Sequence, residues 1–105
     1  MKFHHLGIPT TTEKPGETYL ERYGMFCTDH ESNPFGIQWI RFDADSPLPD
    51  LVKSVPHVAF EVDDLGAAVR GHVILIEPNS PSEGVMVAFV VSDGAPVEFL
   101  QFTKT

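Results

Sequence analysis

One short stretch of this chain occurs twice, and the repeat limits the folds available to it. Residues 3–8 (FHHLGI) fall on residues 55–60 (VPHVAF) at a shift of 52 positions, which matches His5 to His57 and Gly7 to Ala59. Because side chains alternate along a strand, each histidine shares a face with a small residue two positions on. We expect one domain of two similar halves, about 1–48 and 49–105, in which the small neighbours leave room for a ligand.

The first half is expected to contain a strand, a helix and two further strands. The strands are predicted at residues 2–9, 25–28 and 36–43, where apolar and β-forming residues cluster. The helix is predicted from Thr12 as N-cap to Gly24 as a left-handed stop. This half looks too short for a fourth strand. Two prolines in residues 46–49 indicate a linker at the middle of the domain.

The second half repeats the order of strand, helix and strands. Strands are predicted at residues 55–62, 72–76, 85–91 and 97–102, with a short helical turn at 63–70 capped by Asp63 or Asp64. Residues 77–84 are polar and predict a loop. An Asp-Gly pair at residues 93–94 predicts a hairpin turn.

The last strands of the two halves can be aligned in two ways. A shift of 60 matches residues 37–42 to 97–102 and pairs Gln38 with Glu98. A shift of 48 instead pairs Asp50 with Glu98, but it leaves almost no connection between Asp50 and His57. We therefore prefer Gln38 and keep Asp50 as the alternative.

The charge of the chain excludes several classes of partner. Asp and Glu number 15 against 7 Lys and Arg, so the formal net charge is −8, and basic residues form no run. This balance argues against nucleic acid and anionic membranes as partners and leaves small molecules, metal cations and proteins. No apolar stretch approaches the roughly 20 residues that span a bilayer. With one cysteine, Cys27, expected to be a buried structural thiol, we predict a cytoplasmic protein.

The pattern resembles the vicinal oxygen chelate superfamily, which includes glyoxalase I, methylmalonyl-CoA epimerase, extradiol dioxygenases and bleomycin-resistance proteins. The resemblance covers essentially the whole chain. It is carried by residues 5–8, by 19–24, by the central block 56–65 and by the closing hairpin 93–99. It implies an α+β fold in which two βαβββ-type modules, both near minimal length here, form a cupped mixed β-sheet.

The same resemblance implies a divalent metal ion, such as zinc, nickel, manganese or iron, held inside the cup. Carried over residue by residue, the ligands are His5, His57 and Glu98, with Gln38 as a fourth. Two imidazoles and a carboxylate leave a metal open positions for substrate oxygens. A metal in such a site can chelate two adjacent oxygens and stabilise an enolate. The general base would be a carboxylate, either Glu98 after transient release from the metal or Glu61 or Glu83.

Other residues are expected to be structural. Strand alternation places His4 on the face opposite His5, and His30 and His72 have no partner in the repeat, so all three are interpreted as surface or packing residues. Most aromatic side chains are expected to build the core, with one or two lining the cup. They are Trp39, Phe42, Phe60, Phe89, Phe99 and Phe102.

The resemblance leaves three functions open. The first is a metal-dependent lyase, isomerase or epimerase of the glyoxalase type that acts on a small metabolite. The second is a metal-free protein of the bleomycin-resistance type that sequesters a small molecule, and the net charge of −8 suits a cationic ligand. The third is a metal-dependent transferase or dioxygenase. A homodimer is expected because minimal modules expose sheet edges.

Overall fold

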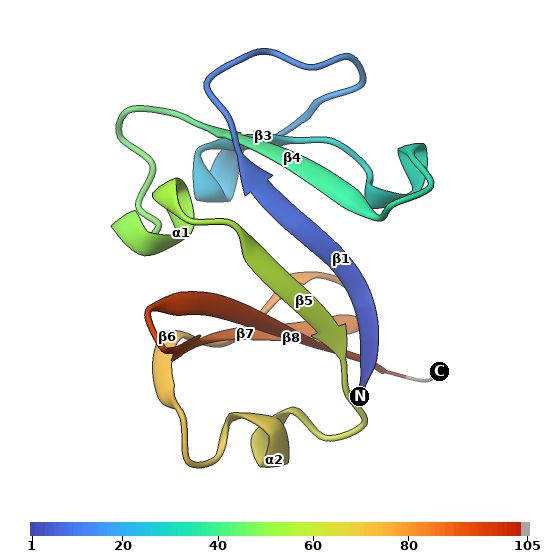
Figure 1. Cartoon of the computed structure of the whole chain (residues 1–105), viewed down its shortest axis with the longest axis vertical. Helices are drawn as coiled ribbons and strands as arrows, with labels where there is room; N and C mark the ends of the chain where they lie inside the picture. The colour runs from blue at the N-terminus through green and yellow to red at the C-terminus, as the bar shows by residue number, and fades with distance from the viewer. Residues whose placement is uncertain (104–105) are drawn as a thin grey trace.

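The strands β1 and β5 run antiparallel at the centre of one mixed sheet of eight strands (Figure 1). The computed structural model describes residues 1–103. Its strands are β1 (Lys2–Pro9), β2 (Thr18–Leu20), β3 (Met25–Cys27), β4 (Ile37–Phe42), β5 (His57–Glu61), β6 (Val73–Ser82), β7 (Val85–Ser92) and β8 (Ala95–Phe102). Its helices are α1 (Asp50–Ser54) and α2 (Leu65–Val69), with the 3-10 turns η1 (Glu21–Tyr23) and η2 (His30–Ser32). Neither α-helix in this part of the chain is long enough to cross a membrane.

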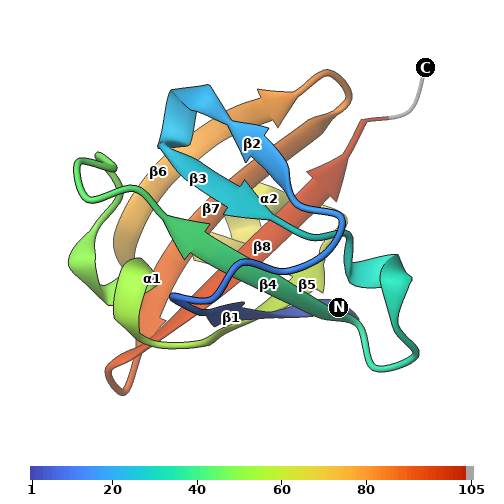
Figure 2. The ribbon, with the colours of Figure 1, turned by 90° about the horizontal axis from the view of Figure 1, so that it is seen from above.

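The strand order is β2-β3-β4-β1-β5-β8-β7-β6. β1 pairs in parallel with β4, and β5 pairs in parallel with β8, while the remaining neighbours are antiparallel. The sheet curls so that its two ends approach each other (Figure 2). This arrangement confirms an α+β fold with a curved mixed sheet. The first half has four strands, so the expectation that it is too short for a fourth is wrong.

The helix predicted between Thr12 and Gly24 does not form. Gly16 adopts a φ of +79°, which no right-handed helix accommodates, and residues 18–20 pair with β3 in an antiparallel hairpin. Gly24 does stop a short turn with a φ of +59°, but that turn is η1. The apolar spacing that indicated a helix therefore belongs to a strand followed by a single 3-10 turn.

Side-chain contacts from the segment between β1 and β2 replace a helix on the outer face of β4. The Lys14 ammonium lies 4.5 Å from the centre of the Trp39 ring. Glu17 accepts two hydrogen bonds from Arg41, at 2.7 and 3.1 Å. Because Trp39 and Arg41 alternate with Gln38 along β4, these contacts leave Gln38 on the inner face.

Alternation along β7 and β8 separates the core from the concave face. Ala88, Val90 and Phe99 pack with Leu65 of α2, so one helix covers the outer side of this half. The intervening residues Val87, Phe89, Glu98 and Leu100 line the cavity on the inner side. Along both strands, alternate side chains therefore pack in the core or line the cavity.

Residues 77–84, predicted as a loop, belong largely to β6. This strand lies at the end of the sheet order and pairs with β7 through three register shifts. Pro78 and Pro81 are compatible with it because an edge strand with bulges does not need every backbone donor. The prediction of a loop there is wrong. The hairpin at residues 93–94 is confirmed, since both residues have positive φ between β7 and β8.

Two hydrogen bonds join the ends of the curled sheet across the opening of the cup. Arg22 donates from Nη1 to the backbone oxygen of Ser80 at 3.2 Å. The Tyr23 hydroxyl donates to Oδ1 of Asn79, also at 3.2 Å. The turn η1 in the first half therefore contacts β6 in the second half (Figure 2).

The cap of α2 distinguishes the two aspartates that the sequence offered. Oδ1 of Asp64 accepts a hydrogen bond from the backbone N–H of Ala67 at 3.1 Å, and Asp63 is an exposed neighbour outside the helix. We expect Asp64→Ala to lower the free energy of unfolding by about 1 kcal/mol, as loss of an N-cap does. Asp63→Ala, the matched control, should leave it within about 0.5 kcal/mol. Urea unfolding of both variants checks this, and equal losses would contradict the capping role.

Candidate functional site

The register of β1 and β5 sets two histidines on the concave face. Gly7 lies opposite His57, and His5 lies opposite Ala59, so each small residue faces the histidine of the other half. A Cβ atom at Gly7 would collide with the ring atoms of His57. The space beside Gly7 is thus filled by the His57 imidazole, and the interpretation that it leaves room for a ligand is wrong.

The parallel pairings carry the same register in both halves. Gly7 pairs with Gln38, and Ala59 pairs with Glu98. Gln38 and Glu98 therefore occupy equivalent positions, as the shift of 60 predicted. Asp50 begins α1, is exposed and does not line the cavity. The register favours Gln38 over Asp50 as the counterpart of Glu98.

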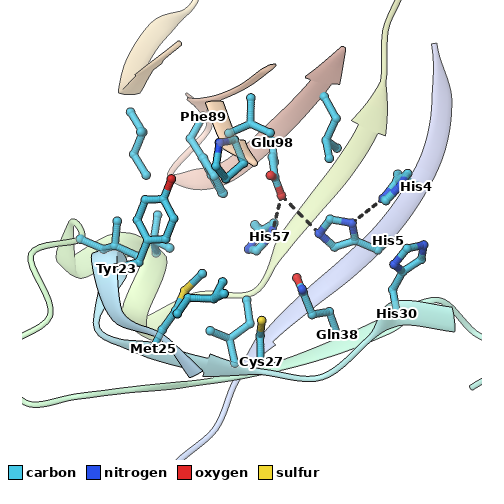
Figure 3. Close-up of a pocket in the computed structure, with 18 of the residues that line it drawn as sticks. His4, His5, Tyr23, Met25, Cys27, His30, Gln38, His57, Phe89 and Glu98 are labelled. Carbon is cyan, nitrogen blue, oxygen red and sulfur yellow. Dashed lines mark hydrogen bonds and ion pairs between the residues drawn. The ribbon is translucent and has the colours of Figure 1, made fainter. Parts of the chain in front are cut away.

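Three of the four predicted ligands meet in a buried cluster (Figure 3). His5, His57 and Glu98 are 5%, 2% and 8% exposed. Oε1 of Glu98 lies 3.1 Å from Nε2 of His57 and 3.2 Å from Nε2 of His5. Gln38 lines the same cavity, and its amide points toward the cluster in Figure 3. The structure thus brings all four residues to one cavity.

The Glu98 carboxylate is ionised over the ordinary pH range. Burial raises its pKa, but the contacts with His5 and His57 outweigh burial and lower that pKa to about 2. An ionised carboxylate only accepts hydrogen bonds, so His57 donates from Nε2 to Glu98. His5 approaches as closely, but its Nε2 is a buried nitrogen without an aligned hydrogen-bond partner, as is Nδ1 of His57.

His4 lies on the same side as His5, which corrects the prediction from strand alternation. The pairing of β1 with β5 shifts register between Phe3 and His5, and this irregularity breaks the alternation at His4. Nδ1 of His4 lies 2.7 Å from Nδ1 of His5, so one of the two nitrogens carries the shared hydrogen. Burial lowers the pKa of His4, and the neighbouring His5 and His30 lower it further.

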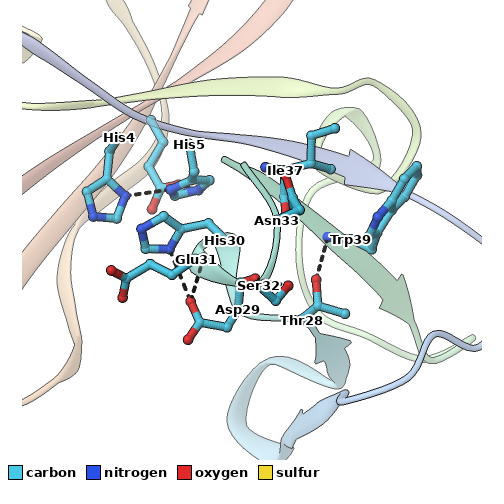
Figure 4. A network of polar contacts seen from close by, with 11 residues as sticks. His4, His5, Thr28, Asp29, His30, Glu31, Ser32, Asn33, Ile37 and Trp39 are labelled. Carbon is cyan, nitrogen blue, oxygen red and sulfur yellow. Dashed lines mark hydrogen bonds and ion pairs between the residues drawn. The ribbon is translucent and has the colours of Figure 1, made fainter. Parts of the chain in front are cut away.

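His30 also belongs to this group, although the sequence suggested a surface or packing role. Its ring lies 4.4 Å from that of His4, and its Nδ1 lies 3.5 Å from Oδ1 of Asp29 (Figure 4). Both His4 and His30 line the cavity. The adjacency of His4 and His5 in the sequence was the one signal that His4 could belong to the site. Nothing in the sequence indicates the register shift that turns His4 toward the cavity. His72 is exposed, as predicted.

A cavity of about 530 Å³ extends from the cluster along the concave face. Its walls come from both halves of the chain and are mostly apolar. Glu31 lines it, whereas Glu61 and Glu83, the other predicted base candidates, do not. Phe42, Phe89 and Phe102 line it as well, whereas only one or two of the aromatic residues were expected to do so.

Cys27 lines the cavity and is only partly buried, so the prediction of a buried position is wrong. Burial nevertheless raises the pKa of its thiol, and the nearby Asp29 and Glu17 carboxylates raise it further. A thiol with a raised pKa stays protonated and is a weak nucleophile. This agrees with the expectation that Cys27 has no nucleophilic role.

The cluster fits a divalent cation in its donor types and spacing. Donor atoms of His5, His57 and Glu98 all lie within 4.8 Å of one another. Neighbouring donors that each lie about 2.1 Å from one cation are about 3.0–3.4 Å apart, and the two Nε2–Oε1 distances here are 3.1 and 3.2 Å. The Nε2 of His5, which lacks an aligned partner, would gain one from a cation.

Sequence comparisons do not assign the chain to a family: no protein-family model and no curated protein matches it. Among solved structures, the chain is similar to the hypothetical protein BH1468 from Bacillus halodurans C-125. The TM-score is 0.66 at 17% sequence identity, and the match covers 99% of this chain and 96% of that chain. A likeness at this identity shows a shared fold.

The close approach of His57 makes Gly7 a sensitive position. We expect Gly7→Ala to lower the free energy of unfolding by about 1–3 kcal/mol, because the new methyl group must displace the His57 ring. Gly66→Ala is the control, since a Cβ there would meet Asp64 at an ordinary 3.4 Å within α2. Denaturant unfolding and the NMR signals of His57 check both variants. Unchanged stability of Gly7→Ala would contradict this placement of the ring.

Acid should destabilise the metal-free protein through Glu98. Its folded pKa of about 2 is below the usual 4.5, so its contribution to stability is complete above about pH 4.5 and is lost as pH falls toward 2. At about 1.4 kcal/mol per pKa unit, this loss amounts to up to about 3 kcal/mol. Denaturant unfolding from pH 6 to pH 2 should show a steeper decline for the wild type than for Glu98→Gln. Parallel curves would refute the shift.

Proposed function

We propose that the protein is a metal-dependent lyase, isomerase or epimerase of the glyoxalase type that acts on a small molecule with two adjacent oxygens. The observation that carries this proposal is the buried convergence of His5, His57 and Glu98 at one end of a cavity. The matching registers of β1 with β4 and of β5 with β8 support a layout of two related modules.

His5, His57 and Glu98 would hold the metal, with Gln38 as the fourth residue facing it. A divalent metal bound there supplies a Lewis acid that stabilises negative charge on substrate oxygens. The chain contributes two imidazoles and one carboxylate, fixed by strands of both halves. Gly7 and Ala59 keep the two histidines in register across β1 and β5.

Glu98 is also our candidate for the group that accepts a substrate proton. While both imidazoles contact its carboxylate, its pKa of about 2 makes it a weak base. It would therefore act only after release from these contacts. Glu31, which also lines the cavity, is the alternative carboxylate that the structure adds.

A metal-free binding protein is the second candidate. The specific observation in its favour is that the metal-free cluster is already partly satisfied, since His57 donates to Glu98 and His5 contacts it. The apolar walls of the cavity suit a bound small molecule equally well. Metal content separates the two candidates.

We expect untagged wild-type protein, incubated with zinc, nickel, manganese or iron(II) and then desalted, to retain close to one equivalent of divalent metal. His5→Ala, His57→Ala and Glu98→Ala each remove a ligand, so retained metal should fall at least tenfold. Gln38→Ala should weaken retention less. Elemental mass spectrometry measures the content, and circular dichroism verifies that each variant is folded.

His72→Ala is the matched control for the histidine variants, because His72 is exposed and lies outside the cavity. It should retain metal like the wild type. Wild-type protein that retains none of the four metals would overturn the metalloenzyme proposal in favour of metal-free binding. Equal metal loss from His72→Ala would show that the bound metal lies elsewhere.

A further inference from the structure

The shape and charge of the cavity define the class of molecule that it accepts. We infer that the ligand has an apolar body and a single oxygen-bearing head, and that it carries no phosphate. The position of the head rests on the proposed function. The apolar body rests on the cavity walls alone.

Most polar groups of the cavity gather on one side; Tyr23 and Asn79 are the exceptions, and their polar atoms are hydrogen-bonded to each other. Figure 3 shows Gln38, His5, His30 and His4 close to one another, with Tyr23 and Met25 on the other side of the cavity. The remaining walls are largely aliphatic and aromatic. They include Met25, Ile40, Ile76, Val87, Phe89 and Leu100. A molecule whose oxygens reach the cluster must therefore place the rest of its surface against apolar side chains.

No lysine or arginine of residues 1–103 lines this cavity, while two carboxylates, Glu98 and Glu31, do. A phosphate group on the body, against the walls away from the cluster, would lose water without gaining a cationic partner, which is unfavourable. Three basic side chains have partners outside the cavity: Arg41 pairs with Glu17, the Lys53 ammonium donates to the backbone oxygen of Ser46, and Arg22 donates to the backbone oxygen of Ser80. Phosphorylated metabolites and nucleotide-linked thioesters are poor matches.

The size of the cavity is consistent with this class. Its volume of about 530 Å³ falls within the roughly 300–1,000 Å³ of sites that bury drug-sized ligands. Burying the apolar body of such a ligand contributes affinity in proportion to the area removed from water. Affinity should therefore rise with the apolar surface of the ligand.

Two probes with the same apolar body, one with and one without a phosphate group, test in metal-free protein whether the cavity binds apolar molecules and rejects phosphate. In EDTA-treated wild-type protein, 2-naphthol should bind saturably and at least tenfold more tightly than 2-naphthyl phosphate, as measured by calorimetry. Equal or tighter binding of the phosphate ester would overturn the inference. So would the absence of saturable 2-naphthol binding.

Two variants on one strand localise the binding. Ile76 lines the cavity, whereas Ile74, also on β6, is exposed and does not line it. Ile76→Thr should weaken 2-naphthol binding about three- to tenfold, and Ile74→Thr should leave it unchanged. Equal effects of the two variants would place the probe outside this cavity and overturn the inference.

A second pair of probes separates the ligand class from the metal proposal. Benzohydroxamate and acetohydroxamate carry the same chelating head, and the first should bind zinc-loaded protein at least tenfold more tightly. Equal affinities would overturn the inference that the ligand has an apolar body, while leaving the metal proposal intact. If the protein retains none of the four metals but binds 2-naphthol as expected, the metal proposal fails and the ligand class stands.

Discussion

The antiparallel pairing of β1 and β5 is the constraint on which the site depends. It joins the two halves of the chain and places Gly7 opposite His57 and His5 opposite Ala59. A slip of one residue would turn every side chain of a strand to the other face, which would move a histidine from the cavity to the outside. The tight fit of the His57 ring against Gly7 opposes such a slip.

The buried charge of Glu98 is balanced locally, and this links the site to the fold. A buried carboxylate without partners would be strongly unfavourable, but two imidazoles contact this one. A cation bound by the same atoms would stabilise the carboxylate in place of the imidazole N–H groups. The imidazole nitrogens release their protons when they bind a metal. The geometry that stabilises the metal-free protein is therefore also the geometry that suits a metal.

The sequence predicts the strands and the site better than it predicts the connections. Strand positions and the equivalence of Gln38 and Glu98 follow from period-two patterns and an internal repeat, which are long-range signals. The helix expected at residues 12–24 fails because strand pairing and the positive φ of Gly16 outweigh local spacing. The prediction for His4 is wrong because the local sequence does not indicate the register shift between Phe3 and His5.

The two hydrogen bonds from Arg22 and Tyr23 to β6 hold the ends of the curled sheet together. They cross the opening, whereas the strand ladders run along the sheet. Each such bond contributes on the order of 1 kcal/mol, so parting the ends costs far less than separating two paired strands. Substitution of these two side chains would therefore let the ends of the sheet part more readily while the resistance of the fold to unfolding stays nearly constant.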